Sequence, residues 1–455
     1  MSSPTTPTPT PTPTPPRRAD LEVSLDQPDR LFVPGDTITG TVHNWAKPAR
    51  PSSIDIILEG RSKTCTQAKS QSGFVNRSRV PLVYQVHHVE VPEPPSSEDP
   101  VRYAITVPDT VDLDPTGAAA KINPSRFYWS KSWTEAAGYK HEPGHALPPS
   151  MMMPTRVDTR EGVSCGWGHI QYTLRAVQTC ETGGQGTRRE SDHEAVRIGR
   201  ARISREQFNE RFGATKNTAR HKERLTIRNR LLDPCAESEE STWKNSVKDA
   251  FRDIPTLVLI LAVTAPKAVA LGDKVNLGIS LAASSLQRGF PLPSLTLHHV
   301  NVHLVGIQGL RVMGRIIKAA PRYEFPGGTR AGHAFTTRHV FHPTEDDSGY
   351  QDTACEVRFR IPASCLPTFQ TYNIQQKWQI KVETVFRCVK QEVKAQIECD
   401  LELVACQRSG DGEADDDGAS AEAPPLEEYD PNGLEMSSDV AGGVGSLVSG
   451  ISMFT

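Results

Sequence analysis

Apolar and polar residues alternate at every second position in two long stretches, residues 21–60 and residues 365–406. A period of two is typical of a β-strand with one face in water, whereas a helix repeats every three to four residues. In the first stretch, the alternation over 21–25 is broken by turn residues ending in Pro34-Gly35-Asp36, and it resumes over 37–42. Strands separated by such turns predict antiparallel β structure.

The same period recurs in two groups, one on each side of a long charged segment. Both groups consist of short apolar rows whose intervening residues are polar, which is the pattern of sheets that bury one face. We therefore predict an all-β fold with two immunoglobulin-like antiparallel β-sandwich domains in tandem. The rows of the first group are Ile54, Ile56 and Leu58; Tyr103, Ile105 and Val107; and Tyr172, Leu174 and Ala176. Those of the second are Val275 to Leu281; Val300, Val302 and Leu304; Val357, Phe359 and Ile361; Trp378, Ile380 and Val382; and alternate positions of 393–403.

Composition divides the chain into five parts. Residues 1–19 are a Thr/Pro-rich segment, which we predict to be disordered because proline fixes the backbone and lacks an N–H donor. Residues 20–182 hold the first group of strand patterns, and residues 254–407 hold the second. Between them, residues 183–253 are rich in Lys and Arg and poor in strand formers, which indicates a mostly irregular basic linker. Residues 408–455 predict an acidic disordered tail.

One short helix is predicted inside the basic linker. Ser204 is a favourable N-cap residue, and Gln207 stands three positions later, where a capping box requires it. Gly213 is a suitable stop. The spacing predicts a helix over 205–212.

The arginines of the linker have two interpretations. One is a solvated connector. The other is a surface for anionic phospholipid or phosphorylated partners, because clustered Arg side chains attract phosphate without needing a fixed fold. For the second interpretation we select four residues, whose charge reversal should release the protein from phosphoinositide vesicles: Arg197, Arg200, Arg202 and Arg205.

Charge and cysteine content exclude several classes of protein. The net charge of −3 arises because a basic middle and an acidic tail nearly cancel, so no overall field favours nucleic acid. Nine cysteines without a C-x-x-C pair fit neither a disulfide scaffold nor a zinc ribbon. The N-terminus lacks a signal-peptide pattern, and the longest apolar run, 257–263, is too short to span a bilayer. We expect a cytoplasmic protein, soluble or peripheral to membranes.

Motifs that suggest catalysis or metal binding lack the context they need. Ser164 lies in a G-x-S-x-G sequence, but a nucleophile elbow requires a strand-to-helix turn, and the residues after Ser164 have a strand pattern. We expect a Gly-rich loop there. His299 and His303 would lie about 13 Å apart on one strand, which is too far for one metal ion. Three further histidines fall in a segment expected to be rich in loops and have no supporting acidic residues: His333, His339 and His342. We predict no enzymatic activity, no cofactor and no metal.

Five segments in order resemble the arrestin fold family. The first two are the L-x-V-x-L-D-x-P-x-x-x-F-V-P-G-D-x-I-x-G-x-V sequence at 21–42 and I-D-I-I-L-E-G at 54–60. The next two, at 145–150 and 168–176, are similar to the L-P-P-S and Y-x-L-x-A stretches of fungal arrestin-like proteins. The fifth, at 366–374 with the strand that follows, resembles the end of the arrestin C-terminal domain. The resemblance covers most of the chain from Asp20 to Gln407.

This resemblance implies a non-catalytic adaptor that binds cytoplasmic parts of membrane transporters or receptors. It also implies peripheral recruitment to the plasma membrane or endosomes. In the fungal and α-type branch, tail motifs of the P-P-x-Y type recruit the WW domains of a HECT ubiquitin ligase, which links the cargo to endocytosis and trafficking. The alternative is a signalling or vesicle-coat scaffold of the same fold without a ubiquitin ligase. A β-sandwich hydrolase is a third interpretation, but it would need clustered carboxylates or a placed nucleophile.

The tail departs from the ligase-binding motif in its spacing. Pro424, Pro425 and Tyr429 are the candidate partner-binding residues, yet two extra residues separate the prolines from the tyrosine. A WW domain holds the proline pair and the tyrosine at a fixed separation, so we expect weak binding or none. Pro81 and Tyr84 have a P-x-x-Y spacing, but the pattern around them predicts a strand that would make them inaccessible.

Overall fold

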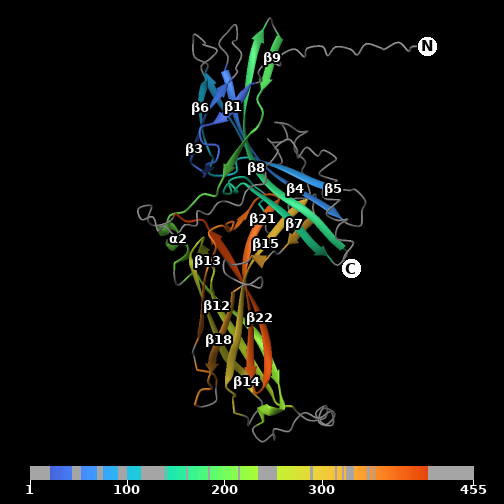
Figure 1. Cartoon of the computed structure of the whole chain (residues 1–455), viewed down its shortest axis with the longest axis vertical. Coiled ribbons are helices and arrows are strands. Elements are labelled where there is room, and N and C mark those ends of the chain that lie inside the picture. The colour runs from blue at the N-terminus through green and yellow to red at the C-terminus, as the bar shows by residue number, and fades with distance from the viewer. Residues whose placement is uncertain are drawn as a thin grey trace, which may run out of the picture.

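The structure is a computed structural model, and its described residues form a mostly-β protein with roughly two β-rich halves. The described ranges are 21–43, 53–68, 75–90, 100–113, 139–140, 142–159, 162–182, 185–213, 216–233, 254–286, 291–312, 315–319, 322–323, 333–345, 349–351 and 354–407. Figure 1 shows an elongated molecule with one half above the other. Of the described helices, none is long and apolar enough to cross a membrane.

The first half consists of two sheets. The smaller sheet has the order β1-β3-β6, and the larger has the order β2-β10-β8-β4-β5, with β7 and β9 also paired to β8. The smaller contains β1 (Glu22–Leu25), β3 (Thr37–His43) and β6 (Val101–Thr106). The larger contains β2 (Leu31–Phe32), β4 (Ser53–Ala68), β5 (Val75–Glu90), β7 (Met151–Thr159), β8 (Gly162–Thr182), β9 (Gln185–Glu190) and β10 (Glu194–Ile198).

The second half also consists of two sheets, with the orders β11-β12-β14-β19 and β13-β22-β21-β15-β16. In the second of these, β17 and β18 also pair with β15, and β20 pairs with β21. The first contains β11 (Thr218–Arg228), β12 (Thr256–Pro266), β14 (Lys274–Leu286) and β19 (Cys355–Arg360). The second contains β13 (Ala268–Ala270), β15 (Leu295–Val312), β16 (Arg315–Ala319), β17 (Arg322–Tyr323), β18 (His333–Phe341), β20 (Phe369–Gln370), β21 (Ile374–Cys388) and β22 (Gln391–Val404).

The predicted alternation determines which side chains are buried. In β6, every second residue is buried, and β19 repeats that pattern. In β21, Trp378, Ile380 and Val382 are buried between half-buried polar residues. Each half has its own large cluster of such buried apolar side chains. The strand prediction is confirmed at these positions because burial on one face of a sheet requires a period of two.

Two short strand pairs are parallel, which the antiparallel prediction did not include. β10 runs parallel to β2, and β13 runs parallel to β22. In each pair, more than a hundred residues separate the two strands in the sequence. Tight turns do not join such strands, so turn sequences carry no information about their direction.

The basic segment differs from the predicted linker. The prediction of a mostly irregular segment over 183–253 is wrong for its described residues, because β9 and β10 extend the first half and β11 pairs with β12 along 11 residues. β11 carries many charged residues, and most of them are exposed. The many Lys and Arg residues of this segment hide the alternation of apolar and polar residues by which a strand is predicted.

The predicted helix is confirmed as α2 (Arg205–Phe212). Ser204 is its N-cap, and its side chain accepts a hydrogen bond from the Gln207 N–H. The Gln207 side chain accepts in return from the Ser204 N–H at 2.8 Å, which completes the capping box. The helix lies beside the junction between the two halves (Figure 1). A 3-10 turn, Arg230–Leu232, is the other helical element described.

Candidate functional site at the junction between the two halves

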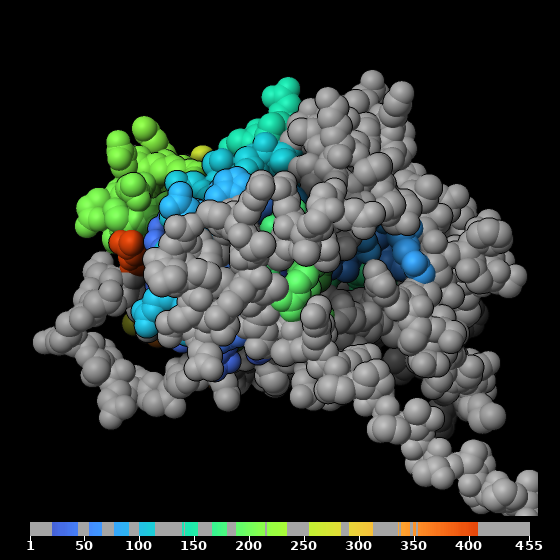
Figure 2. Space-filling view, turned by 90° about the horizontal axis from the view of Figure 1, so that it is seen from above, coloured from blue at the N-terminus to red at the C-terminus, as the bar shows by residue number. Residues whose placement is uncertain are grey.

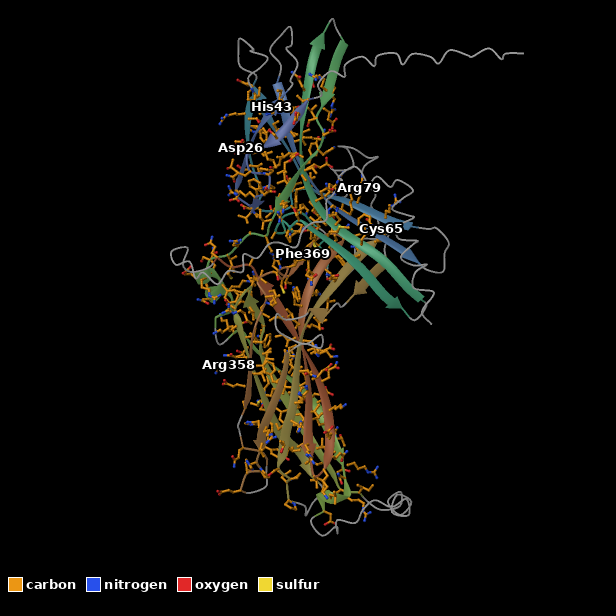
Figure 3. The ribbon with its side chains drawn as sticks, in the orientation of Figure 1. Asp26, His43, Cys65, Arg79, Arg358 and Phe369 are labelled. Carbon is orange, nitrogen blue, oxygen red and sulfur yellow. The ribbon has the colours of Figure 1, made fainter. Side chains whose placement is uncertain are left out.

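The two halves share one core at their junction. Four apolar side chains of the second half belong to the buried cluster of the first half: Leu310, Phe369, Tyr372 and Ile374. Gly168 of β8 makes room for this contact, because a Cβ at Gly168 would lie 2.5 Å from the Leu310 Cδ2. Figure 3 shows Phe369 where the two halves meet. The C-terminal end of β15 and the N-terminal end of β21 therefore pack as part of the first half.

Buried hydrogen bonds connect β4 to the second half. The Ser62 hydroxyl donates to the Asn373 side-chain oxygen, and the Thr64 hydroxyl donates to the Arg311 carbonyl at 2.8 Å. The Asn373 side-chain amide reaches the Thr64 Oγ1 at 3.4 Å, and its carbonyl accepts from the Arg311 N–H at 2.8 Å. All four residues are at most 1% exposed. Because such groups are costly to leave unpaired in an apolar interior, these bonds define how the halves fit together.

A second set of contacts lies around Tyr372. Its hydroxyl donates to the Leu113 carbonyl at 2.9 Å, and the edge of the His145 ring lies 4.9 Å from its ring, centre to centre. Next to it, the Lys140 N–H donates to the Thr371 carbonyl at 3.1 Å. Burial lowers the pKa of His145, which favours the neutral form of its ring. The junction therefore has polar contacts on two sides of the shared apolar core.

Arg311 places a positive charge in the junction. Its side chain is almost fully buried, and its guanidinium lies 5.8 Å from the centre of the Tyr139 ring. Burial lowers the pKa of Arg311 from its ordinary value, and burial raises the pKa of Tyr139. Gly309 leaves space for Tyr139, because a Cβ there would lie 2.8 Å from the tyrosine hydroxyl oxygen. The arrangement holds a cation against an aromatic face.

α2 lies in the segment between the two halves and packs on the second half. Phe208 packs on Ala268 and Ala270 of β13. Two ion pairs join the helix to the second half, Arg205 to Asp273 at 2.7 Å and Arg211 to Glu402 at 3.1 Å. The segment that crosses between the halves is thus attached to the second half along the length of the helix.

The four arginines selected from the sequence have different environments. Arg205 is paired with Asp273, so its charge is compensated. Burial lowers the pKa of Arg200, and Arg197 lies half-buried in β10. Arg202 alone of the four is exposed. The other three are half-buried, which reduces their availability to an anionic surface.

Other residues considered in the sequence have the following positions. Pro424, Pro425 and Tyr429 lie outside the described residues. Ser164 lies within strand β8 instead of the expected loop, and Pro81 and Tyr84 lie in strand β5 as predicted.

The histidine-rich segment is also a strand. His333 and His339 lie in β18 instead of the expected loop-rich segment, and His342 follows that strand directly. In the part of the chain that the structure describes, no group of three or more His, Cys, Asp or Glu residues is arranged to hold a metal ion. We base no conclusion about catalysis on that finding.

A charged row lies on the face of β4 and β8 that is opposite the first-half core. Glu59 is 4% exposed at its side chain and lies 3.9 Å from Arg61 and 4.0 Å from Arg175. His169 is buried in the same row, and burial lowers its pKa to about 4, with Lys63 and Arg61 adding to the effect. Like charges near a buried imidazole favour its neutral form.

The low pKa of His169 predicts a pH-dependent stability. An unfolded histidine binds a proton near pH 6.5, whereas folded His169 does so only near pH 4. The unfolded state therefore holds more protons between these values, and the free energy of unfolding should fall by about 3 kcal/mol as the pH drops from 6.5 to 4. Urea unfolding at a series of pH values measures this. His169→Gln should flatten the profile over that range, and exposed His87→Gln is the matched control.

Sequence reasoning missed the junction. Residues 366–374 carried a motif, but the pairing of Asn373 with Ser62 joins positions 311 residues apart. Neither residue differs in the sequence from an ordinary turn or strand residue. Comparison with protein-family models and with curated proteins found no match.

Proposed function

We propose that the chain is a non-catalytic adaptor of arrestin type, built from two tandem immunoglobulin-like β-sandwiches. It would bind cytoplasmic parts of membrane transporters or receptors and link them to ubiquitin-dependent endocytosis and trafficking. One observation carries the proposal: two antiparallel β-rich halves share a core and buried hydrogen bonds at their junction. A fixed pair of sheets offers extended surfaces to a partner, and specificity then depends on loops and edges.

Proximity labelling in the native cell tests the adaptor function. The full chain carries the labelling enzyme, and membrane transporters or receptors should be enriched together with a ubiquitin ligase. An Asn373→Asp variant, which puts a charge into the buried junction, should lose the cargo without losing expression. Enrichment of coat or signalling components without any membrane cargo would contradict the proposal.

A signalling or vesicle-coat scaffold is the second candidate, and the tail spacing favours it. Pro425 and Tyr429 are four positions apart in the chain, with Leu426, Glu427 and Glu428 between them. A P-P-x-Y ligand has one residue in that place, so the WW groove cannot hold both ends at once.

Tail peptides distinguish the two candidates. The native peptide should bind isolated WW domains weakly or not at all, whereas deletion of Leu426 and Glu427 restores the spacing and should produce clear binding. Titration of both peptides against a panel of WW domains measures this. Tight native binding that Tyr429→Ala abolishes would refute the spacing argument and support direct ligase recruitment. If neither peptide binds, the scaffold is favoured.

A further inference from the structure

Strand β11 carries a row of cations on the side that faces away from the core. Leu225 and Ile227 point into the second-half core, so the even-numbered residues face solvent. Four of these are basic and exposed: Arg220, Lys222, Arg224 and Arg228. Among the described residues none of the four forms an ion pair, and Arg220 donates a hydrogen bond to the Ser280 Oγ at 3.2 Å. We refer to these four residues as the β11 row.

The rest of this sheet face adds positive charge. Next to the β11 row, β12 and β14 present small or neutral residues, such as Ala262 and Gly278. Lys274, Arg358 and Arg360 then extend the basic surface across β14 and β19. On this face of the four strands the only carboxylate described is Glu356, which is paired with Arg358 at 2.7 Å. Glu223 of β11 is also exposed, but it lies on the side of the strand that carries Leu225 and Ile227. This face of the sheet therefore carries seven cations and one carboxylate. Figure 3 shows Arg358 on the outer side of the lower half.

The described chain ends beside this face. The Gln407 N–H donates to the Ile203 carbonyl at 3.0 Å, immediately before α2. The neighbouring Arg205 reaches Asp273, which directly precedes the exposed Lys274. In Figure 2 the red end of the described chain lies against the green region that contains α2. A cleft of about 300 Å³ opens between Phe208 of α2 and the strands of this sheet. The tail therefore begins at one end of the basic face.

The sequence just after Gln407 has a matching charge pattern. Asp411, Glu413, Asp415 and Asp417 occupy every second position, with Gly412, Ala414 and Asp416 between them. In an extended chain, alternate side chains lie on one side about 7 Å apart, which is also the spacing of Arg220, Lys222 and Arg224 along β11. Each extended residue spans about 3.5 Å, so the four residue steps from Gln407 to Asp411 can span about 14 Å.

We propose that residues 411–417 lie extended along the outer face of β11, with their alternate carboxylates against the β11 row. Each exposed ion pair is weak, but several at a common spacing on a tethered chain reinforce one another. A lipid surface has neither that spacing nor an attachment to the chain. These two observations favour the tail over an anionic membrane as the occupant. The proposal is independent of the adaptor function.

Zero-length carbodiimide cross-linking of the full chain tests the contact directly. The Lys222 amine should form an isopeptide bond to an activated side-chain carboxylate of 411–417, which mass spectrometry of the digest identifies. The variant that combines Asp411→Asn, Glu413→Gln, Asp415→Asn and Asp417→Asn should lose most of this product. A matched variant of the same tail, with Glu427→Gln, Glu428→Gln and Asp430→Asn, should retain it. If Lys222 couples only to other carboxylates of the native chain, the proposal is wrong.

A binding measurement separates the tail from a membrane. A labelled peptide of residues 408–419 is titrated into the full chain that carries the four tail substitutions at 411, 413, 415 and 417. It should bind, and Arg220→Glu with Arg224→Glu should weaken binding by about tenfold. Phosphatidylserine vesicles provide the alternative occupant. Neutralising the native tail should increase vesicle binding, because it uncovers the face. The proposal fails if the native chain and the tail variant bind vesicles equally and only Arg220→Glu with Arg224→Glu abolishes vesicle binding. In that case the membrane is the occupant of this face.

Discussion

Gly40→Ala is expected to unfold the first half under conditions in which the native chain is folded. A Cβ at this position would lie 2.0 Å from the Ser24 carbonyl oxygen and 2.4 Å from the Tyr103 hydroxyl. The Ser24 carbonyl is backbone of β1, and it already accepts a hydrogen bond from the Tyr103 hydroxyl at 2.9 Å. The clash can be relieved only by separating β1 from β3, so we expect a loss of about 3 kcal/mol.

Denaturant unfolding of the purified chain measures this loss. Gly349→Ala is the matched control, because no atom lies within 4 Å of its Cβ position, and it should leave the midpoint almost unchanged. A native-like midpoint for Gly40→Ala would mean that the close packing of Tyr103 against β3 is not present in solution.

Asn373→Ala is expected to destabilise the junction by about 2 kcal/mol. The substitution removes the partner of the Ser62 hydroxyl and one contact of Thr64, in a region where both groups are buried. Leaving a buried hydroxyl without a partner costs about 1–3 kcal/mol. Exposed Asn276→Ala is the control, and its effect on unfolding should be small.

A double-mutant cycle isolates the bond between the halves. Ser62→Ala, Asn373→Ala and the double variant are compared by denaturant unfolding. Residues in contact give a coupling free energy of about 0.5–3 kcal/mol, whereas independent residues give none. A coupling near zero would show that the two halves do not meet through these side chains.

The strands of each half could be predicted from the sequence because a half-buried strand shows its burial in a period of two. Trp378, Ile380 and Val382 are an example, and the Ser204 cap identified α2 in the same local way. The period of two did not reveal β11. Its first seven residues are polar, small or charged, and its only buried apolar residues are Leu225 and Ile227. Local patterns cannot report that a charged segment is the edge of a sheet.

The site could not be predicted for a different reason. The contacts of Asn373 and of Arg311 join residues hundreds of positions apart, and each depends on how two sheets meet. Polar residues at such positions resemble surface residues until the fold buries them. Arg205 is the opposite example, because it looks like a free surface cation in the sequence. In the fold it pairs with Asp273, a carboxylate that lies far from it in the chain.

The shared core has a consequence for synthesis of the protein on the ribosome. Leu310 and Ile374 complete the buried cluster of the first half, yet they are translated long after residue 198, where the last strand of that half ends. Until they emerge, the apolar surface around Gly168 stays uncovered. The nascent first half therefore waits through more than a hundred residues of translation with an incomplete core, which makes this surface a natural target for a cotranslational chaperone.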